Sequence, residues 1–406
     1  MYAAGTTVDL TLSLSNPTGA VLGSPGVATL RIMDEEFDTP GEPPNANDDT
    51  NLFVRQQYFD FLNRVPDQAG FDFWVGGITS CGSNLQCIQT KRIDTSAAFF
   101  LSNEFQRTGV VAFLTHKAAA PTVLPLYPRF MEDLQALQRD YVFGAPGANL
   151  QLELNKQAFF PDYMTSVEFI ENLTNLTNQQ YIDRLLQNLG IAQTIPSLSV
   201  AQLTPGEVSP PANSSARGLA FIRRPTDPQQ TAFVSVSFRG LSSAPIAIHL
   251  HGPAAPGTEG PVITVMPTEQ FGNFQITLTI AQLNMLGNGE LYVDVHTTNF
   301  PNGEIRGQLP RTTFIRDTLI NNLNEGKISR DEALRIAVES APLSADEFNR
   351  LFVFREYVGY LRRQPDSAGF NFWLEKLNSF NGDFRRAEMV KAFITSKEYR
   401  ERFGPH

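Results

Sequence analysis

Three of the five histidines of this 406-residue chain fall in one part of it and have spacings that suit a metal site. His249 and His251 are two positions apart, and in a β-strand such residues project from the same face. By the same rule His296 shares a face with Tyr292 and Asp294. Neutral imidazole is a good ligand for copper and zinc. The pattern therefore predicts a three-imidazole site for copper or zinc, provided that the two segments form neighbouring strands.

The segments that carry these histidines alternate apolar and polar residues, which is typical of half-buried strands. A stretch rich in Pro, Ser and Thr, 196–211, precedes the alternation, and helical patterning resumes at Phe314. Six short strands at such spacing are typical of an antiparallel β-sandwich. The predicted strands are 233–238, 246–251, 262–266, 274–279, 290–296 and 305–309.

Two phrases in this region, "IAIHLHGPAAPGTEGPV" and "LTIAQLNMLGNGELYVDVHTTNFPNGEIRGQL", resemble the CHRD (chordin-type) family across its length. The resemblance implies a sandwich of the superoxide-dismutase or immunoglobulin kind. A fainter similarity to copper/zinc superoxide dismutase, in its His-x-His strand, its later "VH" and a following arginine, implies that Arg306 would join the histidines in redox chemistry. That family's bridging histidine and zinc loop have no counterpart here.

A structural role for the histidines stays open beside metal binding. In that interpretation the imidazoles hold the loop 252–260 by hydrogen bonds, with Asp294 or Glu304 as acceptors. Other catalytic patterns are missing from the sequence, including Gly-x-Ser-x-Gly, a phosphate-binding loop and His-Glu-x-x-His. We therefore expect a binding or structural protein, and the enzymatic alternative is a copper-dependent oxidoreductase.

An internal repeat lies on either side of the sandwich. "FVRQQYFDFLNRVPDQAGFDFW" at 53–74 returns as "FVFREYVGYLRRQPDSAGFNFW" at 352–373. Each copy predicts two helices, separated by a Pro-Asp turn whose Asp caps the second helix. The aromatic residues Phe71, Phe73 and Trp74 are expected in the core, with a carbohydrate-binding platform as the alternative.

This repeat, with a closing "SxEYxxRFG" pattern at 396–404, resembles the family catalogued as domain of unknown function 4214. The resemblance implies a helical fold and says little about activity. Members commonly occur in large secreted bacterial proteins beside calcium-binding or adhesive repeats, which favours an extracellular or cell-surface location.

The N-terminal 37 residues predict an antiparallel strand pair. The phrase "LSLSNPTGAVLGSPGVATLRIMDEE" resembles the last two strands of a Calx-β domain, which implies calcium ligands at Asp34, Glu35 and Glu36. The other acidic ligands of that family would lie in its earlier strands, so a solvated strand end is the alternative. A lone hairpin is marginally stable. It must pack on the chain, be completed by another chain, or belong to a truncated protein.

Cys81 and Cys87, the two cysteines, are six positions apart in a loop rich in Gly, Ser and Asn. This spacing permits a local disulfide without requiring it, and two free thiols remain the alternative. The formal net charge of −10 disfavours nucleic acid and anionic membranes as partners. No apolar run is long enough to span a bilayer. The first residues lack the basic and apolar runs of an export signal, so an extracellular protein would require a missing beginning.

The sequence thus predicts a multidomain α+β protein: a helical scaffold with a helix-turn-helix repeat, an inserted antiparallel β-sandwich and an N-terminal hairpin. We expect a secreted or cell-surface scaffold for adhesion, matrix or assembly. Its expected partners are surface or matrix components or other copies of the chain. The predicted segments are 1–37 (Calx-β remnant), 38–50 (linker), 51–194 (first helical half), 195–311 (sandwich) and 312–406 (second helical half).

Overall fold

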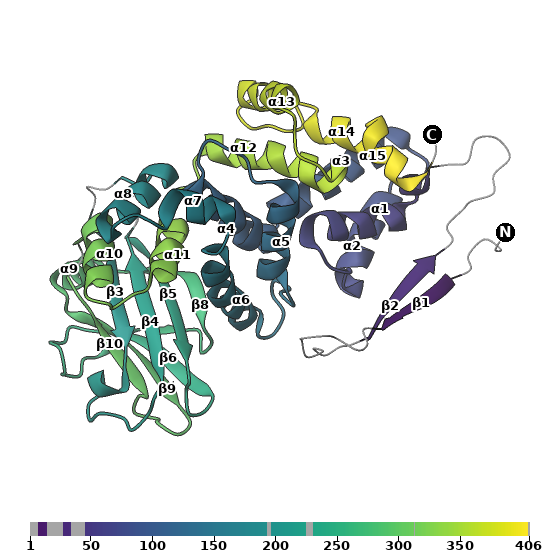
Figure 1. The fold of residues 1–406 in the computed structure, drawn as a ribbon. Coiled ribbons are helices and arrows are strands. Elements are labelled where there is room, and N and C mark those ends of the chain that lie inside the picture. Colours follow the sequence, from purple (N-terminus) through teal and green to yellow (C-terminus); the bar gives the residue numbers. More distant parts are fainter. Residues whose placement is uncertain are drawn as a thin grey trace. The chain divides into compact units, whose positions relative to one another are not determined.

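A computed structural model describes residues 7–13, 27–33, 45–192, 196–224, 230–311 and 313–404 (Figure 1). The chain forms two compact units, and each is considered by itself below. Unit 1 comprises Met1–Leu101 and Phe352–His406, and unit 2 comprises Ser102–Leu351. Helices combine with antiparallel sheets, which confirms the predicted multidomain α+β class. No described helix has the length and apolar character needed to cross a membrane.

Unit 1 contains the N-terminal hairpin and both copies of the repeat. Strands β1 and β2 pair antiparallel, from Thr7↔Met33 to Ser13↔Val27. The elements are β1 (Thr7–Ser13), β2 (Val27–Met33), η1 (Ala46–Asp48), α1 (Thr50–Gln57), η2 (Tyr58–Leu62), α2 (Gln68–Thr79), α3 (Leu85–Leu101), η4 (Tyr357–Leu361), α13 (Ser367–Ser379), α14 (Met389–Ile394), α15 (Lys397–Arg400) and η5 (Glu401–Phe403); α12 (Ala345–Glu356) ends in this unit.

The two copies of the repeat share their backbone geometry in detail. In each, the first helix ends in a π-helical turn, η2 or η4, followed by a residue in the left-handed region, Asn63 or Arg362. The predicted Asp caps are present, because Asp67 accepts a bond from the N–H of Gly70 at 2.8 Å. The matching pair, Asp366 and Gly369, has the same distance. The sequence repeat is therefore a structural repeat.

A glycine at the same place in both copies lets a tyrosine pack against the second helix. A Cβ atom on Gly70 would lie 2.2 Å from the hydroxyl of Tyr58, and one on Gly369 would lie 2.3 Å from that of Tyr357. Both tyrosines are buried, so neither ring has free space to move into. Any larger residue at these positions would displace the ring.

Unit 2 places a helical group beside the sandwich. Its helices are α4 (Asn103–Ala119), α5 (Tyr127–Gln138), α6 (Ala148–Tyr163), α7 (Val167–Leu173), α8 (Asn178–Leu189), α9 (Ile280–Asn288), α10 (Ile315–Asn324) and α11 (Arg330–Ser340), with the short turn η3 (Pro205–Glu207). Its strands are β3 (Pro196–Leu203), β4 (Arg217–Arg223), β5 (Thr231–Arg239), β6 (Pro245–His251), β7 (Val262–Met266), β8 (Phe271–Thr277), β9 (Leu291–Thr297), β10 (Ile305–Leu309) and β11 (Thr313–Phe314).

The strands form two antiparallel sheets that enclose one apolar core. One sheet has the order β10-β9-β6-β7 and the other β11-β3-β4-β5-β8. Side chains from both sheets, such as Ile248, Val293 and Val234, are completely buried between them. The chain enters the sandwich at β3 and leaves it at β11, and these two strands are neighbours, with the pairs Thr313↔Leu198 and Phe314↔Pro196.

Three strands and one helix of this unit lie outside the ranges predicted from the sequence: β3, β4, the two-residue β11 and α9. β3 begins inside the stretch rich in Pro, Ser and Thr, and β4 follows it without a long alternating run. Helix α9 lies between two predicted strands and has clear signals. Thr279 and Gln282 form a reciprocal capping box at its start, and Gly289 ends it in the left-handed region. These signals are short and were outweighed by the surrounding alternation.

Four charged side chains are buried together where the helical group meets the sandwich. Lys156 on α6 lies 2.8 Å from Glu339 on α11 and 3.5 Å from Glu153. Arg335 pairs with Glu153 and lies 3.3 Å from Glu339. All four residues are buried, so each charge depends on the others for compensation. Helix α6 also contacts the edge strand β8, and α10 contacts β3 and the edge strand β11 of the five-stranded sheet.

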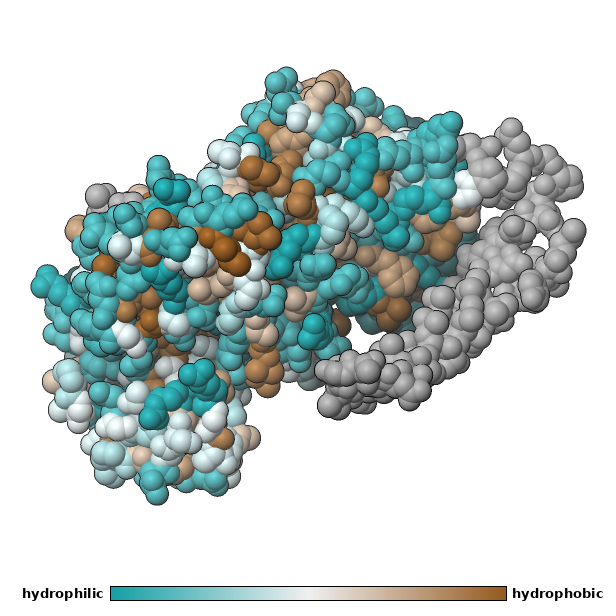
Figure 2. Space-filling view, viewed as in Figure 1, coloured by the Kyte–Doolittle hydropathy of each residue, from teal (hydrophilic) through white to brown (hydrophobic). Residues whose placement is uncertain are grey.

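The visible surface gives no sign of one large apolar face. Figure 2 shows hydrophobic residues in separate patches, with hydrophilic residues between them.

Candidate metal centre

The register of β6 and β9 brings the predicted histidines together. His249 is opposite Asp294, His251 is opposite Tyr292, and Ala247 is opposite His296. All three imidazoles and the carboxylate of Asp294 therefore lie on one face, away from the core residues Ile248 and Leu250. The two strands are thus neighbours in the sheet, as the predicted metal site requires.

Four potential ligand atoms face one another at this position. Nδ1 of His249 lies 3.2 Å from Nε2 of His296 and 3.7 Å from Oδ1 of Asp294. Nε2 of His296 is 3.1 Å from Oδ1 of Asp294, and Nε2 of His251 is 3.2 Å from Oδ2. All four ligand atoms lie within 4.8 Å of one another. With bonds of about 2.0–2.2 Å, a tetrahedral ion keeps its ligand atoms roughly 3.3–3.6 Å apart.

Backbone carbonyls fix which ring nitrogen faces the centre. Nδ1 of His251 donates to the carbonyl of Gly260 at 2.8 Å, and Nδ1 of His296 donates to the carbonyl of Pro301 at 2.9 Å. A carbonyl only accepts, so these nitrogens carry the protons and each Nε2 presents a lone pair to the centre. Metal-binding histidines in proteins are usually held in this way.

Two buried polar atoms at the centre have no hydrogen-bond partner among the described residues: Nε2 of His251 and Oδ1 of Asp294. Nε2 of His251 lies 3.2 Å from Oδ2 of Asp294, but a neutral His251 with its proton on Nδ1 has no hydrogen to donate there. Leaving such atoms unpaired costs free energy. A cation between them would satisfy both, so the donor set fits a transition metal.

When the imidazoles carry a second proton, their hydrogen bonds and charge interactions with Asp294 dominate the electrostatics of the cluster. Burial by itself would raise the pKa of Asp294, but His251 and His296 outweigh it and lower this pKa to about 2. Burial lowers the pKa of His251, yet Asp294 more than compensates, and the net shift is upward. Asp294 is the main cause of the raised pKa of His296. His249 is different, because burial outweighs Asp294 and lowers its pKa.

These shifts predict opposite pH dependences for the metal-free and the metal-loaded protein. His251 and His296 bind protons more tightly in the folded protein, so their protonation stabilises the fold. This stabilisation is complete below their usual pKa of 6.5 and is lost as the pH rises through the raised pKa values. Metal-free protein should therefore gain stability from pH 8.5 to 6.5. Metal-loaded protein should lose stability over the same pH range, because bound metal requires neutral imidazoles. Below pH 6.5, the lowered pKa of His249 opposes this gain in the stability of the metal-free protein.

The measurement is the free energy of unfolding at pH 6.5, 7.5 and 8.5, with chelator or with saturating Zn²⁺. A variant with His249, His251 and His296 changed to Ala is the control, because burial raises the pKa of Asp133 to about 7 and this carboxyl titrates in the same window in both proteins. Equal slopes for the native protein and the variant would contradict the prediction.

Arg306, the residue that a redox site would require, lies beside the cluster but is turned away from solvent. Its guanidinium stacks on the ring of Tyr292 at 3.5 Å and donates to the carbonyl of Thr258 at 2.6 Å. The Tyr292 ring also stacks on the ring of His251, with the two rings parallel and their centroids 4.6 Å apart. Arg306 and Tyr292 therefore support the position of His251.

Of the two acceptors in the structural interpretation, only Asp294 lies among the histidines. Glu304 instead accepts from the hydroxyls of Ser214, Ser242 and Thr297, at 2.6, 2.9 and 2.6 Å, and from the N–H of Ser242 at 2.8 Å. It fixes the loops around β9 and β10. The central place of Asp294 follows from its position opposite His249, which needs the strand register as well as the sequence spacing.

The remaining predicted sites lie elsewhere. Asp34, Glu35 and Glu36 fall outside the described residues. Cys81 and Cys87 are joined by a disulfide in the structure, with Cα atoms 5.6 Å apart. This bond closes the loop between α2 and α3 in unit 1.

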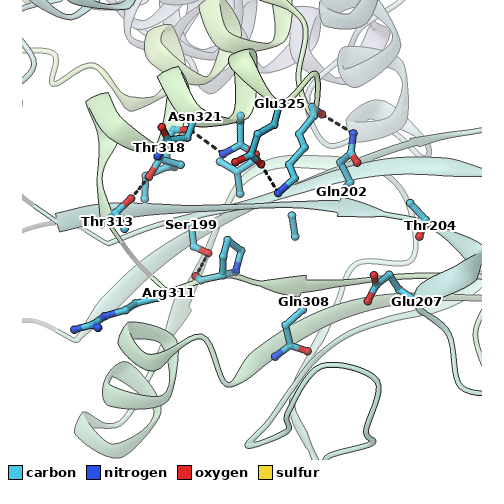
Figure 3. Close-up of a pocket in the computed structure, with 16 residues that line it drawn as sticks. Ser199, Gln202, Thr204, Glu207, Gln308, Arg311, Thr313, Thr318, Asn321 and Glu325 are labelled. Atoms are coloured by element: carbon cyan, nitrogen blue, oxygen red, sulfur yellow. Dashed lines mark hydrogen bonds and ion pairs between the residues drawn. The ribbon is translucent and has the colours of Figure 1, made fainter. Parts of the chain in front are cut away.

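A polar pocket of about 360 Å³ between β3 and α10 offers no comparable chemistry (Figure 3). Its side chains are largely hydrogen-bonded to neighbouring groups. Ser199 donates to the carbonyl of Pro310, and Gln202 to that of Lys327, whose ammonium lies 2.6 Å from Glu325. No histidine or cysteine lines it. The pocket resembles an ordinary packing interface between a strand and a helix more than a reaction site.

Comparison with known proteins finds two families along the chain. The family model of the CHRD domain matches residues 199–309, and that of a domain of unknown function (DUF4214) matches residues 339–403. Neither match includes the N-terminal hairpin, for which the Calx-β resemblance is without support. No curated protein and no solved structure matches the chain significantly. The chain therefore carries a CHRD domain, which contains the three clustered histidines and Arg306, and a DUF4214 region, which contains the second copy of the repeat.

Proposed function

We propose that this protein is an extracellular binding module whose CHRD sandwich holds one transition-metal ion, copper or zinc, through His249, His251, His296 and Asp294. The observation that carries the proposal is the convergence of four ligand atoms, two of them buried without a hydrogen-bond partner. The extracellular setting rests on the CHRD domain, since such domains occur in extracellular proteins. Adhesive or matrix assembly through surface components or other copies of the chain would be the wider role.

The site is suited to binding an ion from solution and keeping it in place. The side chains of His249 and His296 are 19% and 14% exposed, so a cation has access from solvent. The backbone bonds of His251 and His296 hold the imidazoles in the orientation that binding requires, which lowers the ordering cost. Copper, when bound, would supply one-electron chemistry. The buried and hydrogen-bonded state of Arg306 gives no reason to prefer a redox role over binding.

The test is elemental analysis of the purified protein after growth with copper and zinc supplied, beside the variant with all three histidines changed to Ala. We expect about one metal ion per chain in the native protein and none in the variant. Circular dichroism of both proteins checks that the variant is folded. If the native protein holds no metal above the level of the variant after reconstitution and desalting, the proposal is wrong and the histidines are structural.

A further inference from the structure

The repeat in unit 1 displays a large aromatic ring to solvent at the same position in each copy. Phe73 on α2 is 69% exposed and Phe372 on α13 is 56% exposed. The expectation that the ring of Phe73 packs in the core is therefore wrong. Phe71 and Trp74 of the same motif are partly buried, so they contribute to packing without being fully enclosed in the core. Single exposed apolar residues are normal on protein surfaces, so the observation to explain is that the same ring is exposed at the same position in both copies.

The repetition itself is evidence that the exposed ring is used. The two copies differ at many positions where side chains face solvent, and Val65, also exposed, is replaced by Gln364 in the second copy. Phe73 and Phe372 are identical and both exposed. A residue without packing or function would be free to diverge in the same way as Val65.

The surroundings of each ring are also repeated. Phe73 meets the partly buried Trp74 edge to face at 4.9 Å, and Phe372 meets Trp373 in the same way at 5.1 Å. Each tryptophan packs in turn on a buried phenylalanine, Phe99 or Phe393, at 5.6 Å. The exposed ring is thus held by a fixed neighbour, and binding to it would require little ordering.

A polar residue precedes each exposed ring in the sequence. Asp72 precedes Phe73, and Asn371 precedes Phe372, and both are exposed hydrogen-bonding side chains. Next to Phe73 on α2, Gly76 and Gly77 leave open space, because a Cβ atom at either would meet nothing within 4 Å. One side of the Phe73 ring is therefore open, whereas the second copy has Glu375 and Lys376 at the positions that match the two glycines.

The size of these surfaces indicates the kind of ligand. Each ring offers on the order of 100–150 Å², whereas a stable protein interface needs about 800 Å² per partner. One pyranose ring has a face of the right size, with C–H groups that the negative face of an aromatic ring attracts, and hydroxyls that a carboxylate or amide can bind.

We propose that Phe73 and Phe372 are two equivalent contact residues for an extended polysaccharide, each stacking on the face of one sugar ring. The proposal is independent of the metal centre, which lies in unit 2. Each contact is weak alone, and two on one polymer chain multiply through effective concentration. The presence of two equivalent contacts therefore favours a polymer over a free monosaccharide.

The test is retention of the full chain on immobilised cellulose, chitin, xylan, dextran, alginate and peptidoglycan, with phosphatidylcholine vesicles as a non-carbohydrate surface. We expect retention on at least one polysaccharide. Phe73→Ala and Phe372→Ala should each weaken that binding about 3- to 10-fold, and the double variant at least about 30-fold. Phe73→Leu should behave like Phe73→Ala, because it keeps an apolar side chain but removes the ring.

Val65→Ala is the matched control, since it removes an exposed apolar side chain of the same unit that the second copy lacks. Unchanged thermal unfolding shows that the variants remain folded. Retention on no polysaccharide, or equal retention of the double variant and the native protein, would overturn the proposal. So would binding to the vesicles alone that is lost in the double variant, because it would identify a lipid surface as the ligand.

Discussion

Changing Asp294 to Ala is expected to weaken copper and zinc binding by at least about 100-fold. Even the outer partners of metal ligands contribute 10- to 100-fold to affinity, and Asp294 lies within 3.1–3.7 Å of all three imidazoles. It also supplies the only negative charge of the ligand set, which offsets the charge of the metal in a poorly solvated place. Competition titration with a chromophoric chelator at pH 7.5 measures the change.

Glu259→Gln is the matched control, because Glu259 is an exposed carboxylate of the loop beside the site and is not among the ligands. It should change the affinity by less than about 2-fold, through long-range charge alone. The structural interpretation of the histidines predicts a different result for Asp294→Ala, namely a large loss of stability in metal-free protein and no metal-dependent difference. Chemical denaturation with chelator present separates the two.

Changing Arg335 to Met should destabilise unit 2 by about 3–5 kcal/mol, which is the usual cost of removing one partner from a buried charge cluster. The substitution leaves Lys156 as the one cation in direct contact with Glu153 and Glu339 among the described residues, and Arg223 acts on Glu339 only at longer range. Arg335, ahead of Lys156, is the main cause of the lowered pKa of Glu339, and the two cations together outweigh the burial that would raise this pKa. The loss of stability is measured by equilibrium urea unfolding, monitored by far-UV circular dichroism.

Lys327→Met provides the comparison within the same unit. Lys327 and Glu325 form a pair in which both side chains are about half exposed, and such pairs contribute little. The expected change is below about 1 kcal/mol. If Arg335→Met costs no more than Lys327→Met, the four buried charges do not depend on one another in the way that their distances suggest.

Sequence patterns were sufficient for much of the fold, where local signals agree with tertiary packing. Alternation located β5, β6, β7, β9 and β10 because each strand has one face in the core. It failed for β3, whose proline-rich and serine-rich sequence has weak strand propensity, and which is held by pairing with β4 and β11. It also failed for α9, a helix recognisable only from its capping residues.

For the candidate site, spacing within a strand predicted which side chains share a face, but not which strands are neighbours. His249 and His251 could be paired from sequence alone. The contact of His249 with His296 depends on the β6–β9 register, and so does the central position of Asp294. Neither can be read from spacing along one strand, since a shift of one residue would turn every side chain to the other face.

For the repeat, the sequence predicted the secondary structure but not the exposure of one side chain. Its helices, turns and caps followed from the sequence, including the Asp67 cap. The exposure of Phe73 did not, because aromatic residues at helical spacing are usually packed and nothing local distinguishes the exposed ring from its neighbours.

The pairing of β3 with β11 has a mechanical consequence. A protein that links surfaces is pulled along its chain, and tension on the sandwich would arrive at Pro196 and leave at Phe314, which are adjacent partners. Before that, the load passes through α8 and α10, which contact each other. The strands β6 and β9 lie outside this line of force. Stretching would have to separate the helices and unzip the short β3–β11 pair before it could distort the histidines.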